Sequence, residues 1–327
     1  MKLKRILAVL SAASALCGCT AADMNLGSVT EDEQAVYEAA ENIPQTAAVI
    51  AETTLTETTV TEETVSAGIP MLSEAKPEEP AETSPKLTDE EICALDCEKK
   101  GYGQGLQVDE LNRPLGGLMF NADYTKYDGY ALDESEKAAK QIYLTFDQGY
   151  ENGFTAPILD TLKEKNVKAV FFLTGDYAER NKDLVRRMID EGHVLGNHGM
   201  KHASIPTLSA ESVEKAENEI MSLHEYVKDT YGYEMKYFRP PCGEYSERSV
   251  AIAQRLGYKT LFWSFAYADW DVNNQPECQA AFERISGAAH GGGIFLLHSV
   301  SETNCTVLPQ VIDSFREQGF ELTVPSI

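Results

Sequence analysis

The sequence predicts an α/β fold from about residue 141 onward, in the form of a complete or incomplete (β/α) barrel. Short apolar runs alternate strictly with amphipathic stretches there, which implies parallel strands covered by helices. Six or seven such units are enough to curl a sheet into a barrel, whose chemistry lies at the C-terminal ends of the strands. Polar residues that follow several of the apolar runs directly fit that rule.

The expected strands are short and apolar, and the expected helices lie between them. Strands are predicted at Ile142–Phe146, Ala169–Leu173, Val194–Gly196, Tyr237–Phe238, Thr260–Trp263, Ile294–Leu297 and Phe320–Leu322. Helices are predicted at Thr155–Glu164, Asp183–Glu191, Ala210–Lys228, Ser246–Leu256, Pro276–Ala289 and Leu308–Gln318.

The first nineteen residues have the features of a secretory signal. A short basic region precedes the apolar core Ile6–Leu16, which is too short to cross a bilayer. The core ends in Leu16-Cys17-Gly18-Cys19, which resembles a bacterial lipobox with Cys19 as the lipidated residue. We therefore expect an extracytoplasmic lipoprotein, anchored to the bacterial cell membrane through lipid. An ordinary signal peptide that contains cysteines is the alternative.

Residues 20–91 are rich in Glu, Thr, Ala and Pro, and we predict a disordered acidic linker. The segment holds seventeen acidic residues and two lysines, a large share of the formal net charge of −24. Its apolar surface is too small to offset the entropy of ordering. An acidic chain without a run of lysine or arginine is a poor candidate for binding nucleic acid. Residues 92–140 are assigned as an N-terminal extension of the domain at 141–327, with no role defined by the sequence.

Five cysteines follow the lipobox, at positions 93, 97, 242, 278 and 305. They show no CxxC or zinc-ribbon spacing, so we interpret them as structural. Their odd number leaves at least one thiol free or paired between chains, and a bridge between Cys278 and Cys305 is one option.

Polar residues follow five of the expected strands. In chain order they are Asp147, the pair His198 and His202, Arg239, Asp269 with Trp270, and His298. Each has a structural interpretation when taken alone, as a surface ion pair, a turn with a packed indole or a capping histidine. Their common position at strand ends favours a functional site instead. The remaining histidines, His193, His224 and His290, are interpreted as structural.

The His-x3-His spacing of His198 and His202 suits a single metal ion. Gly199, Met200 and Lys201 lie between the two histidines, so the glutamate of the H-E-x-x-H zinc proteases is absent. Any general base must therefore come from elsewhere, and Asp147 is the candidate.

These segments resemble the five motifs of the polysaccharide deacetylase (NodB-homology) family. The motifs are TFDQG, HGMKH, FRPPCG, ADW and FLLH, in that order, and the resemblance spans residues 141–327. The segments YENG, FWS, NNQ and LHSVS, together with Asn304, are most similar to the subgroup that deacetylates N-acetylmuramic acid in peptidoglycan on the way to muramic δ-lactam. The resemblance implies an incomplete (β/α) barrel and a metal-dependent N-deacetylase.

The resemblance also implies a role for each matching residue. Asp147 corresponds to the general base, and Arg239 to the residue that orients it. His298 corresponds to the general acid, and Asp269 to the carboxylate that positions a catalytic partner.

A second group of residues corresponds to the metal and substrate contacts of the family. His198 and His202 would bind the metal, for which zinc is expected. The backbone N–H of Cys242 would hold the oxyanion, Leu296 would line the pocket for the acetyl methyl group, and Trp270 is placed with the substrate contacts.

Two positions depart from the family pattern. The second aspartate of the first motif, a metal ligand, is Gln148 here, and a neutral amide is a weaker ligand than a carboxylate. The hydroxyl residue after the first metal histidine is Gly199, which predicts a looser loop.

The expected activity is hydrolysis of the N-acetyl group of N-acetylmuramic acid, with peptidoglycan glycan strands as the partner and a monomeric enzyme. One alternative is deacetylation of N-acetylglucosamine in peptidoglycan or chitin, and another is O-deacetylation of xylan. A third is a catalytically inactive lipoprotein that binds wall glycan.

Overall fold

The last residues assigned to the linker, up to residue 91, belong to the folded domain. The computed structural model describes residues 86–327, so the lipobox and the linker up to residue 85 lie outside the described residues. Helix α2 (Asp89–Ala94) begins with a capping box, in which the Thr88 side chain accepts from Glu91 N and Glu91 accepts from Thr88 N. Ile92 is fully buried in the main core. Capping and burial therefore order the last residues assigned to the linker.

All seven strands predicted from the sequence are present, within two residues at either end. In chain order they are β3 (Gln141–Gln148), β4 (Val170–Leu173), β5 (Val194–Asn197), β6 (Tyr237–Phe238), β8 (Lys259–Leu261), β9 (Gly293–His298) and β10 (Glu321–Leu322). Strands β3, β4, β5, β6 and β8 are neighbours in that order and pair in parallel. Strands β9 and β10 also pair in parallel with β3.

The sheet curls into an incomplete barrel, as predicted. Between β8 and β9, an irregular segment makes the connection through the single bridge Phe265↔Phe295. Ser264 N donates to Ile294 O over 2.9 Å, and Leu296 N donates to Phe265 O over 2.8 Å. Between β8 and β9 the barrel is therefore held by a few hydrogen bonds and not by regular strand pairing.

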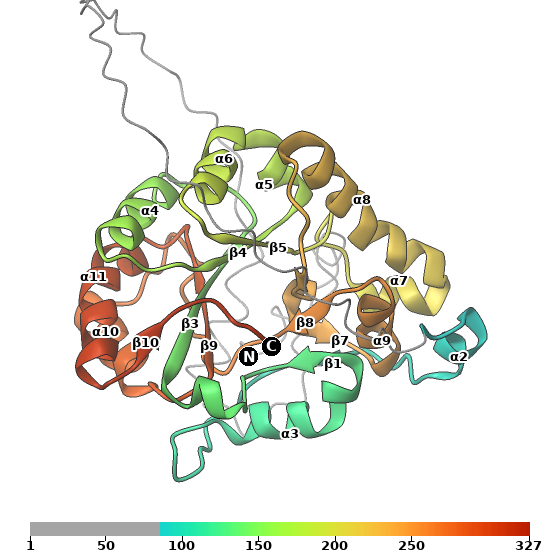
Figure 1. Ribbon diagram of the computed structural model, residues 1–327, viewed down its shortest axis with the longest axis horizontal. Helices are drawn as coiled ribbons and strands as arrows, with labels where there is room; N and C mark the ends of the chain where they lie inside the picture. The colour runs from blue at the N-terminus through green and yellow to red at the C-terminus, as the bar shows by residue number, and fades with distance from the viewer. Residues whose placement is uncertain (1–85) are drawn as a thin grey trace, which may run out of the picture.

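Helices surround the sheet (Figure 1). They are α4 (Thr155–Glu164), α5 (Gly175–Arg180), α6 (Lys182–Asp190), α7 (Ile205–Glu211), α8 (Val213–Tyr231), α9 (Glu247–Arg255), α10 (Cys278–Gly287) and α11 (Glu302–Glu317). The helix predicted at 210–228 is present from residue 213 as α8, but extended backbone at Ser212 separates it from α7, to which residues 210 and 211 belong. Helix α11 starts before the predicted Leu308, because the Ser301 side chain caps it by accepting from Asn304 N.

The extension before residue 141 is part of the barrel. It contains β1 (Lys100–Gly101), α3 (Leu115–Tyr124) and β2 (Gly129–Tyr130), with 3-10 turns at Thr125–Tyr127 and Glu136–Lys140. Strand β2 pairs in parallel with β8, and β1 pairs with the short β7 (Glu244–Tyr245). A separate apolar cluster joins the extension to the barrel through Phe120, Tyr124, Ala131, Leu132, Val250 and Phe262.

The five cysteines within residues 86–327 are all free thiols. The suggested Cys278–Cys305 bridge is therefore wrong: Cys278 is exposed at the first residue of α10, whereas Cys305 is partly buried against the core. In this described range, no helix is both long and apolar enough to cross a membrane.

Candidate active site

Parallel pairing brings the predicted site residues to one rim of the barrel. Asp147 lies opposite His298 in the β3–β9 register. The register of β5 and β6 pairs Asn197 with Phe238, so His198 and Arg239 follow neighbouring strands at the same edge. The expectation that strand ends collect the polar residues is confirmed.

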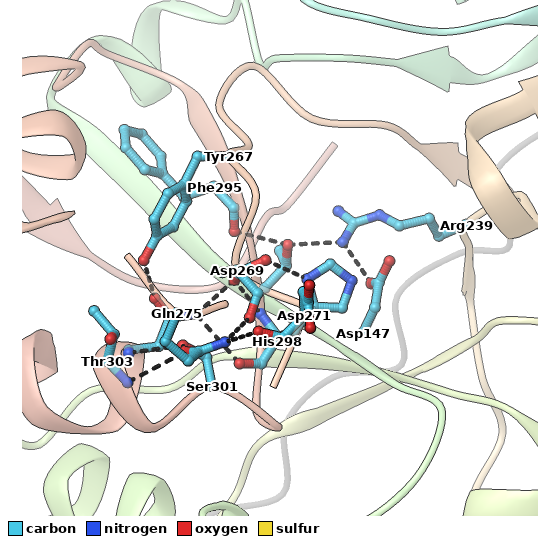
Figure 2. Close-up of polar contacts among 12 residues, drawn as sticks. Asp147, Arg239, Tyr267, Asp269, Asp271, Gln275, Phe295, His298, Ser301 and Thr303 are labelled. Carbon is cyan, nitrogen blue, oxygen red and sulfur yellow. Dashed lines mark hydrogen bonds and ion pairs between the residues drawn. The ribbon is translucent and has the colours of Figure 1, made fainter. Parts of the chain in front are cut away.

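Arg239 fixes the position of Asp147. The guanidinium is fully buried, and its Nη1 donates to Asp147 Oδ1 over 2.8 Å (Figure 2). Its other hydrogen bonds, all between 2.9 and 3.0 Å, go to Thr145 Oγ1, Leu261 O and Phe262 O. With every contact made inside the barrel, the arginine holds the carboxylate in one orientation.

The charge around Asp147 suits a proton acceptor. Burial alone would raise the pKa of its carboxyl, but Arg239, His198 and His298 act in the opposite direction. The net result is a pKa of Asp147 below its ordinary value. The side chain is therefore an ionised carboxylate at neutral pH.

The two histidines of the second motif point their Nε2 atoms at each other. His198 Nδ1 lies 2.8 Å from Arg239 O, so that nitrogen carries the proton and Nε2 has the free lone pair. His202 Nε2 is 3.2 Å from His198 Nε2. Burial lowers the pKa of both rings, that of His202 to about 3, so both are neutral.

This distance fits a shared metal ion. Zinc–nitrogen bonds of about 2.0–2.1 Å at a tetrahedral angle place two nitrogens roughly 3.3–3.4 Å apart. The free lone pair of His198 Nε2 can accept a hydrogen bond from His202 Nε2–H, or, with the proton of His202 on Nδ1, both Nε2 atoms can face one cation.

Gln148 supplies a third polar atom at this edge of the sheet. The side chain is 1% exposed, and its Nε2 donates to Ser299 Oγ over 2.5 Å. Its Oε1 is buried and has no hydrogen-bond partner in the described part of the chain. A buried oxygen without a donor is costly unless a cation or another donor faces it. Residues 86–327 contain no group of three His, Cys, Asp or Glu arranged to hold a metal.

His298 and Asp269 form the other half of the site. Asp269 Oδ1 lies 2.7 Å from His298 Nδ1, and Oδ2 accepts from the His298 backbone N over 2.8 Å (Figure 2). Burial alone would lower the pKa of His298, but Asp269 raises it, and the net pKa lies above the ordinary value. The imidazole is thus suited to carry a proton that it can donate. The Trp270 ring packs edge-on against it, with 6.0 Å between ring centroids.

Replacing Asp269 with asparagine is expected to move the alkaline limb of the pH profile to lower pH. An acid acts only in its protonated form, so activity falls as the pH rises through the pKa of His298. Loss of the carboxylate lowers that pKa, and the fall then begins earlier. The measurement is kcat/KM against pH for the wild type and D269N. An unchanged alkaline limb would show that His298 is not the titrating acid.

Three side chains that the sequence did not assign to catalysis hold the Asp269 turn. Asn304 Nδ2 donates to Asp269 Oδ2 over 2.5 Å, and the Tyr267 hydroxyl donates to Asn304 Oδ1. Gln275 Nε2 donates to the carbonyl oxygens of Asp269 and Asp271, while its Oε1 accepts from Ser301 Oγ (Figure 2). For two of these side chains, Gln275 and Asn304, the sequence did offer a signal, namely the similarity of NNQ and Asn304 to the deacetylase subgroup.

Cys242 and Leu296 lie close to the C-terminal ends of β6 and β9. Cys242 sits in the 3-10 turn Pro241–Gly243 with φ 58°, three residues after Arg239, and its side chain is exposed. Leu296 is 5% exposed and shares a face of β9 with His298, two residues further on. The backbone N–H of Cys242 as an oxyanion donor remains a prediction.

The other three histidines make contacts in the scaffold. His193 Nδ1 accepts from Ala169 N over 3.2 Å. His224 Nδ1 lies 2.6 Å from the Tyr258 hydroxyl, and His290 Nε2 lies 2.8 Å from Ser264 Oγ. Their structural interpretation agrees with these contacts.

A carboxylate held by arginine, a histidine held by aspartate and two convergent imidazoles at the rim of a (β/α) barrel define a hydrolase site. Residues 134–261 match the polysaccharide deacetylase family model. The chain belongs to this family, whose enzymes hydrolyse N-acetyl bonds of polysaccharides.

Two relatives and one solved structure illustrate the similarity. The peptidoglycan-N-acetylmuramic acid deacetylase PdaA of Bacillus subtilis is 40% identical over 208 residues, 63% of this chain and 77% of that protein. A peptidoglycan-N-acetylglucosamine deacetylase of Bacillus cereus is 32% identical over 192 residues, 57% of this chain and 68% of that protein. The structure of B. subtilis PdaA, a family 4 carbohydrate esterase, matches with a TM-score of 0.64 and 37% identity over 70% of this chain and 95% of that one.

Proposed function

We propose that this protein is a metal-dependent hydrolase that removes the acetyl group from N-acetylmuramic acid in peptidoglycan, as in the formation of muramic δ-lactam. The observation that carries the proposal is the intact pair of dyads, Asp147 with Arg239 and His298 with Asp269, beside the histidine pair, with Asp147 Oδ2 3.5 Å from His198 Nε2. The similarity to PdaA supports muramic acid as the sugar.

The reaction needs a base, an acid and a donor for the oxyanion. Asp147 accepts the proton of the attacking water, because it is ionised and held still by Arg239. The Cys242 backbone N–H donates to the oxygen of the tetrahedral intermediate. His298 then gives its proton to the sugar nitrogen as the C–N bond breaks, and acetate leaves. Asp269 keeps the acid oriented throughout.

His198, His202 and Gln148 would hold the divalent metal, for which we propose zinc. When bound, the ion lowers the pKa of water and polarises the acetyl carbonyl. Two histidines and one amide leave positions open for water and substrate, as a catalytic site requires.

The test is mass spectrometry of muropeptides after digestion with the purified protein. Loss of one acetyl group per disaccharide, mapped to the muramic acid by fragmentation, is the expected result. Deacetylation of glucosamine instead would favour the alternative that the B. cereus relative suggests. Release of acetate only from acetylated xylan would indicate the esterase alternative, and no turnover together with retained glycan binding would indicate an inactive wall-binding protein.

Changing Gln148 to aspartate is expected to tighten zinc binding, because a carboxylate is a stronger ligand than a neutral amide. Activity need not rise. A second negative charge beside Asp147 would raise the pKa of that base in the metal-free protein, and it would make the ion a weaker Lewis acid. The measurements are zinc affinity by competition with a chelating dye and the deacetylation rate. Equal zinc affinities would place residue 148 away from the metal.

We also propose that a lipid on Cys19 holds the protein at the outer face of the bacterial cell membrane, where it acts on glycan strands as a monomer. The Cys19→Ala variant is expected to appear in the medium instead of the membrane fraction. Fractionation and mass spectrometry of the mature N-terminus check this. A soluble, unacylated wild type would contradict the anchor.

A further inference from the structure

The loop that carries both metal histidines has an unusual backbone. Gly199 has φ 83°, and His202 has φ 56°, in the left-handed region that disfavours residues with a side chain. Such a conformation is unfavourable for a residue with a side chain unless its surroundings impose it. The histidine pair therefore depends on contacts from outside the loop.

Glu219, on α8, makes those contacts. The side chain is 8% exposed, and its Oε1 accepts from Lys201 N over 2.6 Å and from Ala203 N over 3.1 Å. Its carbonyl oxygen accepts from Met200 N over 3.0 Å. One residue of α8 thus binds three backbone N–H groups of the loop, including those on both sides of His202.

Gly199 leaves the space that Glu219 needs. A Cβ atom at position 199 would come within 2.8 Å of Glu219 Oε1. On the other side of the glycine, Gly199 N donates to Asn197 Oδ1 over 2.9 Å. A carboxylate from α8 and an amide from β5 thus contact the backbone on both sides of Gly199, and the looser loop expected from the sequence stays a prediction.

The carboxylate is better suited to this task than a neutral group. Hydrogen bonds to an ionised acceptor are roughly twice as strong as neutral ones. Among the described residues, no Lys, Arg or His forms an ion pair with Glu219, so the loop N–H groups are its main electrostatic partners. A buried charge of this kind is costly and needs such donors.

We propose that Glu219 is a positioning residue for the metal site, which shapes the loop so that His198 Nε2 and His202 Nε2 face one ion. The proposal rests on the proposed metal-dependent function, and it assigns no contact with the substrate to Glu219.

Three variants of the full-length chain test the proposal. Glu219→Ala removes the acceptor, Glu219→Gln keeps one neutral acceptor oxygen, and Glu225→Ala changes an exposed glutamate on the same helix as the matched control. Zinc affinity is measured by competition with a chelating dye. Hydrogen exchange of the Lys201 and Ala203 amides is measured in the metal-free protein, and deacetylation is measured at saturating zinc.

Zinc affinity is expected to fall about 10- to 100-fold in E219A, as for other residues that orient metal ligands. The loss should be smaller in E219Q, and E225A should match the wild type. Exchange of the two amides should quicken in E219A and E219Q, and saturating zinc should restore most of the rate. Wild-type zinc affinity in E219A, or unchanged exchange in E219Q, would overturn the proposal.

The proposed function and the proposed role of Glu219 can be refuted independently of each other. A wild type that binds no zinc and deacetylates no wall glycan would refute the proposed function. Amide exchange in the metal-free variants would still decide whether Glu219 holds the loop. If E219A does not fold, E219Q provides both measurements, since it preserves the size of the side chain.

Discussion

Asp147→Asn is expected to lower the deacetylation rate about 10²- to 10⁴-fold, the usual contribution of a general base. The amide cannot accept a proton from water, but it retains an oxygen for the hydrogen bond from Arg239. The loss should therefore appear in kcat, with a fold that circular dichroism cannot distinguish from the wild type. Turnover is measured on muropeptides under saturating zinc.

His298→Ala, which removes the proposed general acid, is expected to have a comparable effect on the deacetylation rate, which should fall by a similar factor. The residual activity of H298A should no longer decline at alkaline pH, where the imidazole of the wild type loses its proton. Substrates whose leaving group needs no proton, such as activated esters, should show a smaller loss of hydrolysis rate in H298A than amides do. Full activity in either variant would remove that residue from the mechanism.

Arg239→Ala is expected to destabilise the protein by about 3–5 kcal/mol, because it leaves Asp147 as an uncompensated buried charge. The change also removes the hydrogen bonds that link β6 to β3 and β8 across the barrel interior. Thermal unfolding should shift on the order of 10 °C for a domain of this size. Calorimetry or circular dichroism measures the shift.

Arg180→Ala is the control for this experiment. Arg180 pairs with Asp176 on the surface of α5 with a largely exposed side chain, and exposed pairs contribute about 0–1 kcal/mol. A similar melting temperature for R239A and R180A would contradict the structural role of the buried ion pair.

The strands and the residues at their ends could be predicted because both are local signals. A buried parallel strand is a continuous apolar run, and a polar side chain directly after it lies at the rim whichever strands are neighbours. Asp147, His198, Arg239 and His298 were found in this way.

The residues that were missed act across long distances in the chain. Glu219 lies on a helix in a pattern that fits any amphipathic segment, and only the packing of α8 on the loop reveals its role. The left-handed backbone at Cys242 was also invisible, because cysteine does not favour that conformation, and the modest preference of histidine for it was too weak a signal to predict it at His202. The other described non-glycine residues with positive φ are Asn112, Asp128 and Asn166, whose types do favour it.

Strand β2 shows that the segment recognisable by family resemblance is smaller than the segment that must fold together. A truncated protein beginning at residue 134 or 141 would lack β2, leaving the outer edge of β8 without its partner. Val250 and Phe262 would lose the apolar cover of Phe120 and Leu132. An uncovered strand edge beside exposed aromatic surface promotes self-association, so such a fragment would tend to aggregate. A soluble catalytic fragment should begin before Thr88, ahead of the capping box of α2.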